Sequence, residues 1–298
     1  MNSTDTFSTY NPIINFAFFI GAIAFGMIFV HPAFLVCACA LSAAYYLTIK
    51  GLRGLKLIVG MIPVYLFLSL INPVLNTRGQ QVLFTYFGGR PYTLEALYYG
   101  MALAAIFVSV ILWFAAYNAV MTSDKFLYLF GRVIPSISLI LTMVLRLVPG
   151  FQRKTVQISS ARRCIGKAGS GETKMERAEN GMTIVSALTS WALEGGIVTA
   201  DSMRSRGYGS GRRSTFSIYR FEMRDKLLLG CMILLIGVIF FCSAGGATKA
   251  SYTPVFEIAP VDNIYSVVGI AAYAVFLIIP TALNIMEALT WHILRSRI

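Results

Sequence analysis

Apolar runs close to the length that crosses a membrane recur along this chain of 298 residues. Six of them approach that length: Ile13–Val30, Phe34–Ile49, Leu57–Ile71, Leu94–Val120, Lys226–Cys242 and Ile264–Ile285. A helix needs about 20 apolar residues to cross the roughly 30 Å hydrocarbon core of a bilayer. Charged residues make up only 13% of the chain, well below the usual fraction in a soluble domain. The sequence therefore predicts a protein whose solvent is lipid.

The predicted fold is all-α: a polytopic membrane protein of about six transmembrane helices with a cytosolic pair of helices. Positive charges in short loops mark the cytosolic side, and Lys50, Arg53 and Lys56 follow the second apolar run. This places the N-terminus in the cytosol, and Arg295 and Arg297 predict the same for the C-terminus. We expect no cleavable secretory signal, because apolar runs continue along the chain.

The net charge of +12 is unevenly distributed, since 14 of the 25 Lys and Arg residues fall between Arg153 and Lys226. Because these residues follow membrane spans, they indicate a cytosolic basic region rather than a nucleic-acid surface. The apolar run Val133–Val148 precedes this region. As a full span it would place the basic residues outside, so we expect an interfacial or bundle-facing helix. The predicted domains are residues 1–132, 133–225 and 226–298.

A helix with one buried face is predicted inside the basic region, after a flexible polar stretch, Gly166–Asn180. Ile184, Leu188, Trp191, Gly195 and Val198 recur at spacings of three and four residues. The helix is expected to end near Gly207, which places Arg204 and Arg206 near its C-terminus, where the helix dipole favours cations. Their guanidinium groups can bind the carboxylates of a partner protein. The alternative partner is the anionic lipid headgroup.

We identify no catalytic, cofactor-binding or metal site in the sequence. Gly166 to Gly171 has the glycine spacing of a phosphate-binding loop, but Glu172 stands where that loop needs lysine. The chain has only two histidines, His31 and His292, and its five cysteines are scattered. The chain is therefore expected not to be an enzyme and to need no cofactor.

The apolar runs carry few charges, and Glu95 and Glu287 lie near the ends of their runs. An ion-driven carrier usually has carboxylates or broken helices at membrane depth. The spans are therefore expected to pack against other proteins or lipid rather than to bind a polar solute. A self-contained membrane carrier and a lipid-bound membrane anchor are the alternative functions.

One stretch of the chain resembles a known family. Residues 200–209 read ADSMRSRGYG, which resembles the second short motif of the T components of energy-coupling factor transporters, Ala-Met or Ser-Met followed by x-x-Arg-Gly-Tyr. Residues 120–151, VMTSDKFLYLFGRVIPSISLILTMVLRLVPGF, resemble the family's approach to its first coupling helix. A less specific resemblance extends over nearly the whole chain, including Asn72 and Pro73.

The family's first motif is typically Ala-Arg-Gly, and two registers are possible here. Ala161-Arg162-Arg163 keeps the Ala-Arg order without the glycine, whereas Cys164-Ile165-Gly166 keeps the glycine without the arginine. Arg162 and Arg163 are therefore both candidates. The resemblance further implies partner-binding residues Ser205, Arg206 and Gly207, supported by Met203, Arg204, Tyr208 and Trp191.

The resemblance implies a bacterial multi-pass membrane protein that is the coupling subunit of an importer for a vitamin or a transition-metal ion. Its implied partners are two ABC ATPase subunits, whose acidic grooves would receive the motif arginines, and a substrate-capturing membrane protein called the S component. The subunit would transmit ATP-driven movement of the ATPases to the S component. No nucleic acid is expected as a partner.

Overall fold

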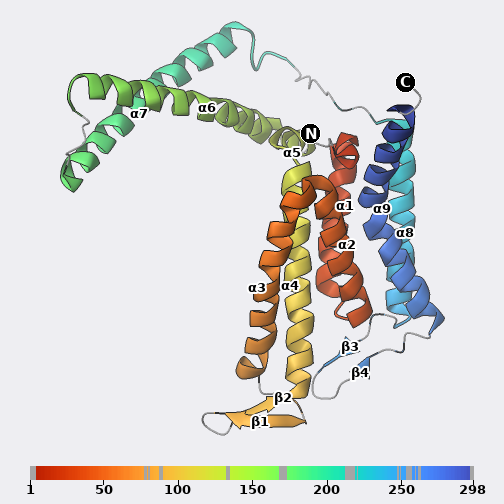
Figure 1. Ribbon diagram of the computed structural model, residues 1–298. Coiled ribbons are helices and arrows are strands. Elements are labelled where there is room, and N and C mark those ends of the chain that lie inside the picture. Colours follow the sequence, from red (N-terminus) through yellow and green to blue (C-terminus); the bar gives the residue numbers. More distant parts are fainter. Residues whose placement is uncertain are drawn as a thin grey trace. The chain divides into compact units, whose positions relative to one another are not determined.

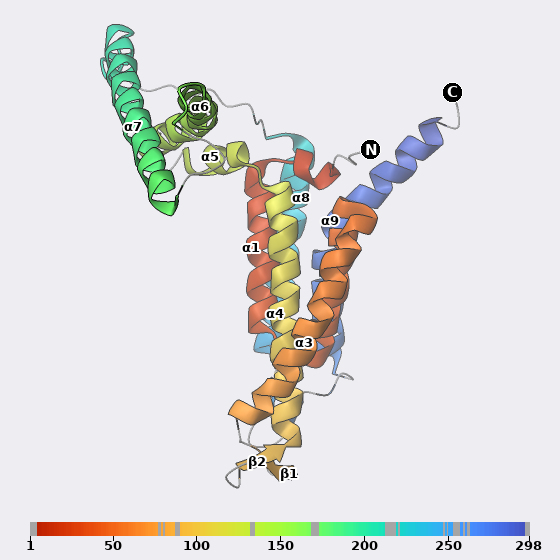
Figure 2. The same ribbon diagram turned by 60° about the vertical axis from the view of Figure 1, so that its left-hand side comes forward.

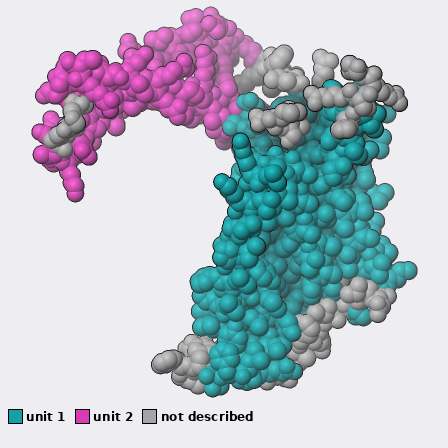
Figure 3. Space-filling model, viewed as in Figure 1, with its two compact units in different colours: residues 1–126, 219–298 teal, residues 127–218 magenta. Residues whose placement is uncertain are grey.

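The computed structural model describes most of the chain in two compact units. The described residues are 5–76, 79, 81–86, 90–131, 135–167, 173–211, 219, 221–246, 248, 250–252, 257–258, 260 and 263–295. Unit 1 comprises residues 1–126 and 219–298, and unit 2 comprises residues 127–218 (Figure 3).

Unit 1 is a bundle of long helices that run alternately in opposite directions (Figures 1 and 2). Its helices are α1 (Pro12–Ile28), α2 (Pro32–Lys50), α3 (Leu55–Leu75), α4 (Leu94–Val120), α8 (Met223–Ala244) and α9 (Ile264–Arg295). These helices correspond to the six apolar runs predicted from the sequence. The prediction of an all-α polytopic membrane protein is confirmed.

The two ends of the bundle differ in what they carry. One end, which we call the η1 end, carries the short 3-10 helices η1 (Thr6–Thr9) and η2 (Gly51–Gly54), the start of α8 and the end of α9 (Figure 1). The opposite end carries two antiparallel strand pairs. These are β1 (Val82–Tyr86) with β2 (Arg90–Thr93), and β3 (Ala250–Ser251) with β4 (Glu257–Ile258).

Five helical stretches among the described residues are long and apolar enough to cross a membrane: Pro32–Leu75, Leu94–Val120, Lys174–Ser205, Met223–Ala244 and Ile264–Trp291. The first contains both α2 and α3, and α1 is a shorter apolar helix of 17 residues. Lys174–Ser205 is the least apolar of the five and belongs to unit 2. Its cytosolic location stays a prediction.

An aromatic core joins α1, α2, α4 and α9. Phe18 of α1 lies edge-on to Trp113 of α4, with ring centres 5.5 Å apart, and lies 5.2 Å from Phe276 of α9. Tyr45 of α2 also lies against Trp113, with ring centres 6.0 Å apart. All four side chains are fully buried. Interlocked rings of this kind fix the relative positions of the helices, because aromatic pairs gain most from specific offset and edge-on geometries.

Unit 2 contains two long helices, α6 (Pro135–Cys164) and α7 (Lys174–Ser205). A short helix, α5 (Ser123–Gly131), crosses from unit 1 into unit 2. The sequence predicts a separate helix over Val133–Val148, but α6 continues through Pro149 to Cys164, so the predicted end is wrong. The Nε of Arg153 donates a hydrogen bond to the Pro149 carbonyl oxygen at 3.3 Å, within the turn that follows this proline.

Candidate functional site

The helices α6 and α7 pack against each other in antiparallel directions. Phe151 of α6 lies edge-on to Trp191 of α7, with ring centres 5.6 Å apart, and Lys154 Nζ lies 5.9 Å from the Trp191 ring centre. Further along, Arg162 Nη2 donates a hydrogen bond to Asn180 Oδ1. The second contact lies eleven residues later on α6 and eleven residues earlier on α7. The two helices therefore pair over about 16 Å of their length.

The buried face predicted for α7 is shorter than the sequence indicates. Ile184, Leu188 and Trp191 are half-buried, whereas Gly195 and Val198 are exposed. Val144 of α6, on the stretch before the contact at Phe151, is also exposed. The expected burial of Gly195 and Val198 is therefore wrong, because the α6–α7 contacts described here lie between Phe151–Arg162 and Asn180–Trp191.

The C-terminus of α7 ends in the Arg-Gly-Tyr stretch, and its backbone explains these residue types. The Tyr208 N–H bonds to the Met203 carbonyl oxygen at 3.0 Å, and the Gly207 N–H bonds to the Arg204 carbonyl oxygen at 3.0 Å. This pair of bonds is a Schellman cap, which needs a left-handed residue, and Gly207 has φ of +79°. The predicted stop at Gly207 is confirmed, and Arg206 is the capping residue itself.

The C-terminus of α6 carries the same cap. The Lys167 N–H bonds to the Arg162 carbonyl oxygen at 3.0 Å, the Gly166 N–H bonds to the Arg163 carbonyl oxygen at 3.0 Å, and Gly166 has φ of +74°. Gly166 is thus the structural counterpart of Gly207. Ile165 then occupies the position of Arg206, and Arg163 occupies the position of Arg204. Sequence reasoning noted Gly166 without recognising this shared cap.

The two candidate arginines of the first motif lie in different surroundings. Arg162 is half-buried against α7, where it bonds Asn180, and its Nε is buried without a partner among the described residues. Arg163 and Ala161 are exposed. Both arginines lie in the last turn of α6, where the helix dipole favours positive charge. Of the two arginines, Arg163 is the one whose side chain is exposed to an incoming protein.

The end of α7 is also positively charged and accessible. Ser205, Arg204, Arg206, Gly207 and Tyr208 are exposed, and Met203 is half-buried. Within the described part of the chain, neither Arg204 nor Arg206 forms an ion pair. Asn180, which marks the position of Arg162 along α7, lies 26 residues before Arg206. The two arginine-bearing ends are therefore separated by about 39 Å along α7.

Buried charges in unit 1 lie at helix ends. Among the described residues, the buried charged side chains are Glu95, Lys125 and Asp225, in the first turns of α4, α5 and α8. No cluster of three or more His, Cys, Asp or Glu residues able to hold a metal ion lies in the described part of the chain. The middle of the bundle is occupied by aromatic and aliphatic side chains.

Comparison with known proteins gives one informative similarity. No family model matches the chain. The chain is 30% identical over 116 residues to the energy-coupling factor transporter transmembrane protein EcfT of Lactobacillus helveticus (strain DPC 4571). The match covers 39% of this chain and 42% of that protein, so the chain spans less than half the length of this curated relative. The chain is therefore a membrane protein similar to a transmembrane component of an energy-coupling factor transporter.

Proposed function

We propose that this chain is the transmembrane coupling subunit of an energy-coupling factor importer. It passes ATP-driven movement of two ATPase subunits to a substrate-capturing S component, which takes up a vitamin or a transition-metal ion. The chain itself has no catalytic role. The observation that carries this proposal is the pair of identically capped helices, α6 and α7, each ending in exposed arginine and glycine.

The spacing of the two helix ends supports docking to two separate proteins. Arg163 and Arg206 lie at opposite ends of the α6–α7 pair, about 39 Å apart, so a single carboxylate-lined groove does not reach both. Two ATPase subunits supply two grooves. We assign docking to Arg163 and Arg206, whose side chains are exposed, and helix pairing to Arg162, which bonds Asn180.

The positive charges of unit 1 support a cytosolic location for the η1 end. Lys50 and Arg53 lie at the turn between α2 and α3, Lys56 follows at the start of α3, and Arg224 lies at the start of α8. Short basic loops remain on the cytosolic side of a membrane. On this orientation both termini face the cytosol, where ATPases would be found, and the strand pairs face outward.

A capture protein needs an apolar surface on the membrane unit. α3 packs along α4, and it leaves large apolar side chains exposed, among them Val59, Ile62, Leu66, Phe67 and Leu70. Lipid covers such a surface as readily as another membrane protein does. The proposed S component would replace lipid here or on unit 2, and selection of the cargo would belong to that protein.

Affinity purification of the tagged chain from its native membrane in mild detergent tests the proposal. We expect two nucleotide-binding subunits and a small membrane protein to copurify, with ATP hydrolysis in the recovered complex. The ligand of the small membrane protein would identify the cargo. Recovery of the chain alone, with solute flux after reconstitution, would support a self-contained carrier instead.

A further inference from the structure

The segment from Asp5 to Tyr10, which we call the N-terminal clamp, is buried in the η1 end of the bundle. Phe7 is fully buried, and its ring lies 5.3 Å from Phe18 of α1 and 6.4 Å from Tyr45 of α2, edge-on to both. A short polar segment before the first span would ordinarily lie in water. Here it forms part of the aromatic core.

Polar contacts tie the clamp to α9 and α2. The side-chain oxygen of Asn284 on α9 accepts hydrogen bonds from the Thr6 N–H at 2.9 Å and the Phe7 N–H at 3.4 Å. The Asn284 amide nitrogen and the Tyr45 hydroxyl each donate a hydrogen bond to the Asp5 carboxylate. One asparagine thus satisfies two backbone donors and one charged acceptor of the clamp.

A buried lysine ties the clamp to the start of α5. Lys125 is only 5% exposed, and its Nζ donates to the Ser8 carbonyl oxygen at 2.5 Å and to the Val120 carbonyl oxygen at 2.9 Å. With the Asn15 amide turned to suit its neighbours, Asn15 accepts from Lys125 Nζ at 3.3 Å and donates to the Phe7 carbonyl oxygen at 2.9 Å. Lysine is almost never fully buried unless its charge is compensated. Burial lowers the pKa of Lys125, and the nearby Asp5 opposes that change.

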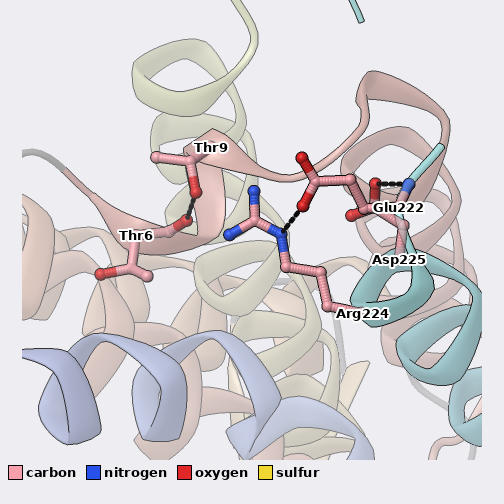
Figure 4. Close-up of polar contacts among 5 residues, drawn as sticks. All are labelled: Thr6, Thr9, Glu222, Arg224 and Asp225. Carbon is pink, nitrogen blue, oxygen red and sulfur yellow. Dashed lines mark hydrogen bonds and ion pairs between the residues drawn. The ribbon is translucent and has the colours of Figure 1, made fainter. Parts of the chain in front are cut away.

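The start of α8 also contacts the clamp. The Arg224 guanidinium lies 5.4 Å from the centre of the Tyr10 ring, and its Nε forms an ion pair with Glu222 at 2.9 Å. Figure 4 shows Arg224 extended beside the turn that carries Thr6 and Thr9. The clamp therefore contacts α1, α2, α5, α8 and α9.

We propose that the N-terminal clamp positions α5 by holding Lys125, so that the segment leading into unit 2 moves with the membrane bundle. Lys125 is a positioning residue: it lies two residues before the boundary of unit 2, and its contacts reach a backbone segment 117 residues away in sequence. An apolar side chain would fill the same space without desolvating a charge, but it would make no bond to Ser8 or Val120. If the chain has the proposed function, the contact between Lys125 and the N-terminal clamp transmits movement between the ATPases and the bundle. This consequence for transport rests on the proposed function.

Hydrogen–deuterium exchange of the full-length chain in lipid nanodiscs tests the clamp without any partner. In Lys125→Met, backbone exchange over residues 121–131 is expected to rise roughly tenfold or more, because a buried hydrogen bond to a charged group is lost. Lys56→Met, at an exposed lysine in the first turn of α3, is the matched control and is expected to leave these residues unchanged. Unchanged exchange over residues 121–131 in Lys125→Met would overturn the proposal.

A second variant separates the clamp from local packing around Lys125. Asn284→Ala removes the contacts of α9 to Asp5, Thr6 and Phe7 but leaves the lysine in place. If the clamp positions α5, exchange rises both in residues 5–10 and in residues 121–131, severalfold in each. A rise confined to residues 5–10 would refute the positioning role.

The expected effect on transport is tested by comparing ATP hydrolysis with substrate uptake. In the purified complex, Lys125→Met is expected to retain ATP hydrolysis within about twofold and to lose most substrate uptake. If ATP hydrolysis and substrate uptake fell equally while the complex stayed intact, the contact of Lys125 with the N-terminal clamp would have no role in transmitting movement. Failure of the wild-type chain to recover ATPases would count against the proposed function alone, because the exchange measurements on the single chain would still decide the clamp.

Discussion

At the residue scale, Arg206 combines a fixed backbone with an accessible side chain. It is the capping residue of α7, so its backbone is fixed by the bonds around Gly207, and its side chain is exposed at the negative end of the helix dipole. A fixed backbone reduces the entropy lost when a guanidinium binds a carboxylate. These properties suit an arginine that must enter a groove on another protein.

We predict that Arg206→Glu abolishes association with the ATPase subunits, because the new carboxylate would face acidic residues of the groove. Arg206→Lys is expected to weaken association about tenfold, since lysine keeps the charge but loses the bidentate geometry. Pull-down from detergent extracts measures both effects. Arg177→Glu, at an exposed arginine in the first turn of α7, is the control and should bind as the parent chain does. Normal binding by Arg206→Glu would remove Arg206 from the docking surface.

Some of the residue-scale features could be predicted from local rules. The Gly207 stop and the cationic end of α7 follow from propensities that need no tertiary context. The different roles of Arg162 and Arg163 could not be predicted, because they depend on Asn180, which lies on the other helix. The burial of Lys125 was missed for the same reason, since its partner carbonyl at Ser8 belongs to a polar segment that shows no apolar pattern.

At the scale of elements, the contact between Phe151 and Trp191 is the aromatic pair described between α6 and α7. Trp191 is half-buried, so its truncation to alanine should destabilise the helix pair by about 2 kcal/mol, below the usual value for a fully buried aromatic. We expect limited proteolysis of the full chain to cut unit 2 faster in Trp191→Ala than in the parent protein. Trp191→Phe should restore most of the resistance, because an aromatic ring would still face Phe151. Equal cutting of the alanine variant and the parent would contradict this packing.

The first turn of α7 is held by a capping box. The Thr173 hydroxyl accepts from the Glu176 N–H at 3.3 Å, and the Glu176 carboxylate accepts from the Thr173 N–H at 2.7 Å. The bond from the Thr173 N–H lowers the pKa of Glu176. The added stability is therefore present above the ordinary pKa of a glutamate and is lost as pH falls through the lowered value.

We accordingly expect acidification to raise amide exchange in residues 174–177 of the parent chain, after correction for the intrinsic pH dependence of exchange. Thr173→Ala should raise it a few-fold already at neutral pH, because one half of the capping box is removed. Residues near Trp191 serve as the internal control. An N-terminal turn equally protected at acidic and neutral pH would show that the capping box contributes nothing.

The six long helices of unit 1 could be predicted from the sequence because each is a long apolar run bounded by turn residues or charges. The 3-10 helices and the strand pairs were not predicted. The end of α6 could not be predicted, since the apolar run stops at Val148 although the helix continues through Pro149 to Cys164. Likewise, helical periodicity predicted one buried face from Ile184 to Val198 of α7. The length of α7 that α6 covers depends on how the two helices align along each other. The periodicity of one helix carries no information about that alignment.

At the scale of the whole molecule, the bundle has an aromatic core and buried charges only near helix ends among the described residues. We predict that the purified chain alone in liposomes transports neither vitamins nor transition-metal ions and hydrolyses no ATP. Uptake should begin only when ATPase subunits and an S component are reconstituted with it. Solute flux through the chain alone would favour the carrier alternative.

The contact between Thr6 and Asn284 also determines when the protein can finish folding. These residues are separated by 278 positions, so the N-terminal segment cannot take its place until α9 has been synthesised and inserted. Until then Asp5 lacks Asn284, and Lys125 lacks the Ser8 carbonyl that the closed clamp supplies. Closure of the η1 end therefore cannot precede the insertion of α9. A chain that stops short of α9 would leave the membrane insertion machinery with its first residues unanchored.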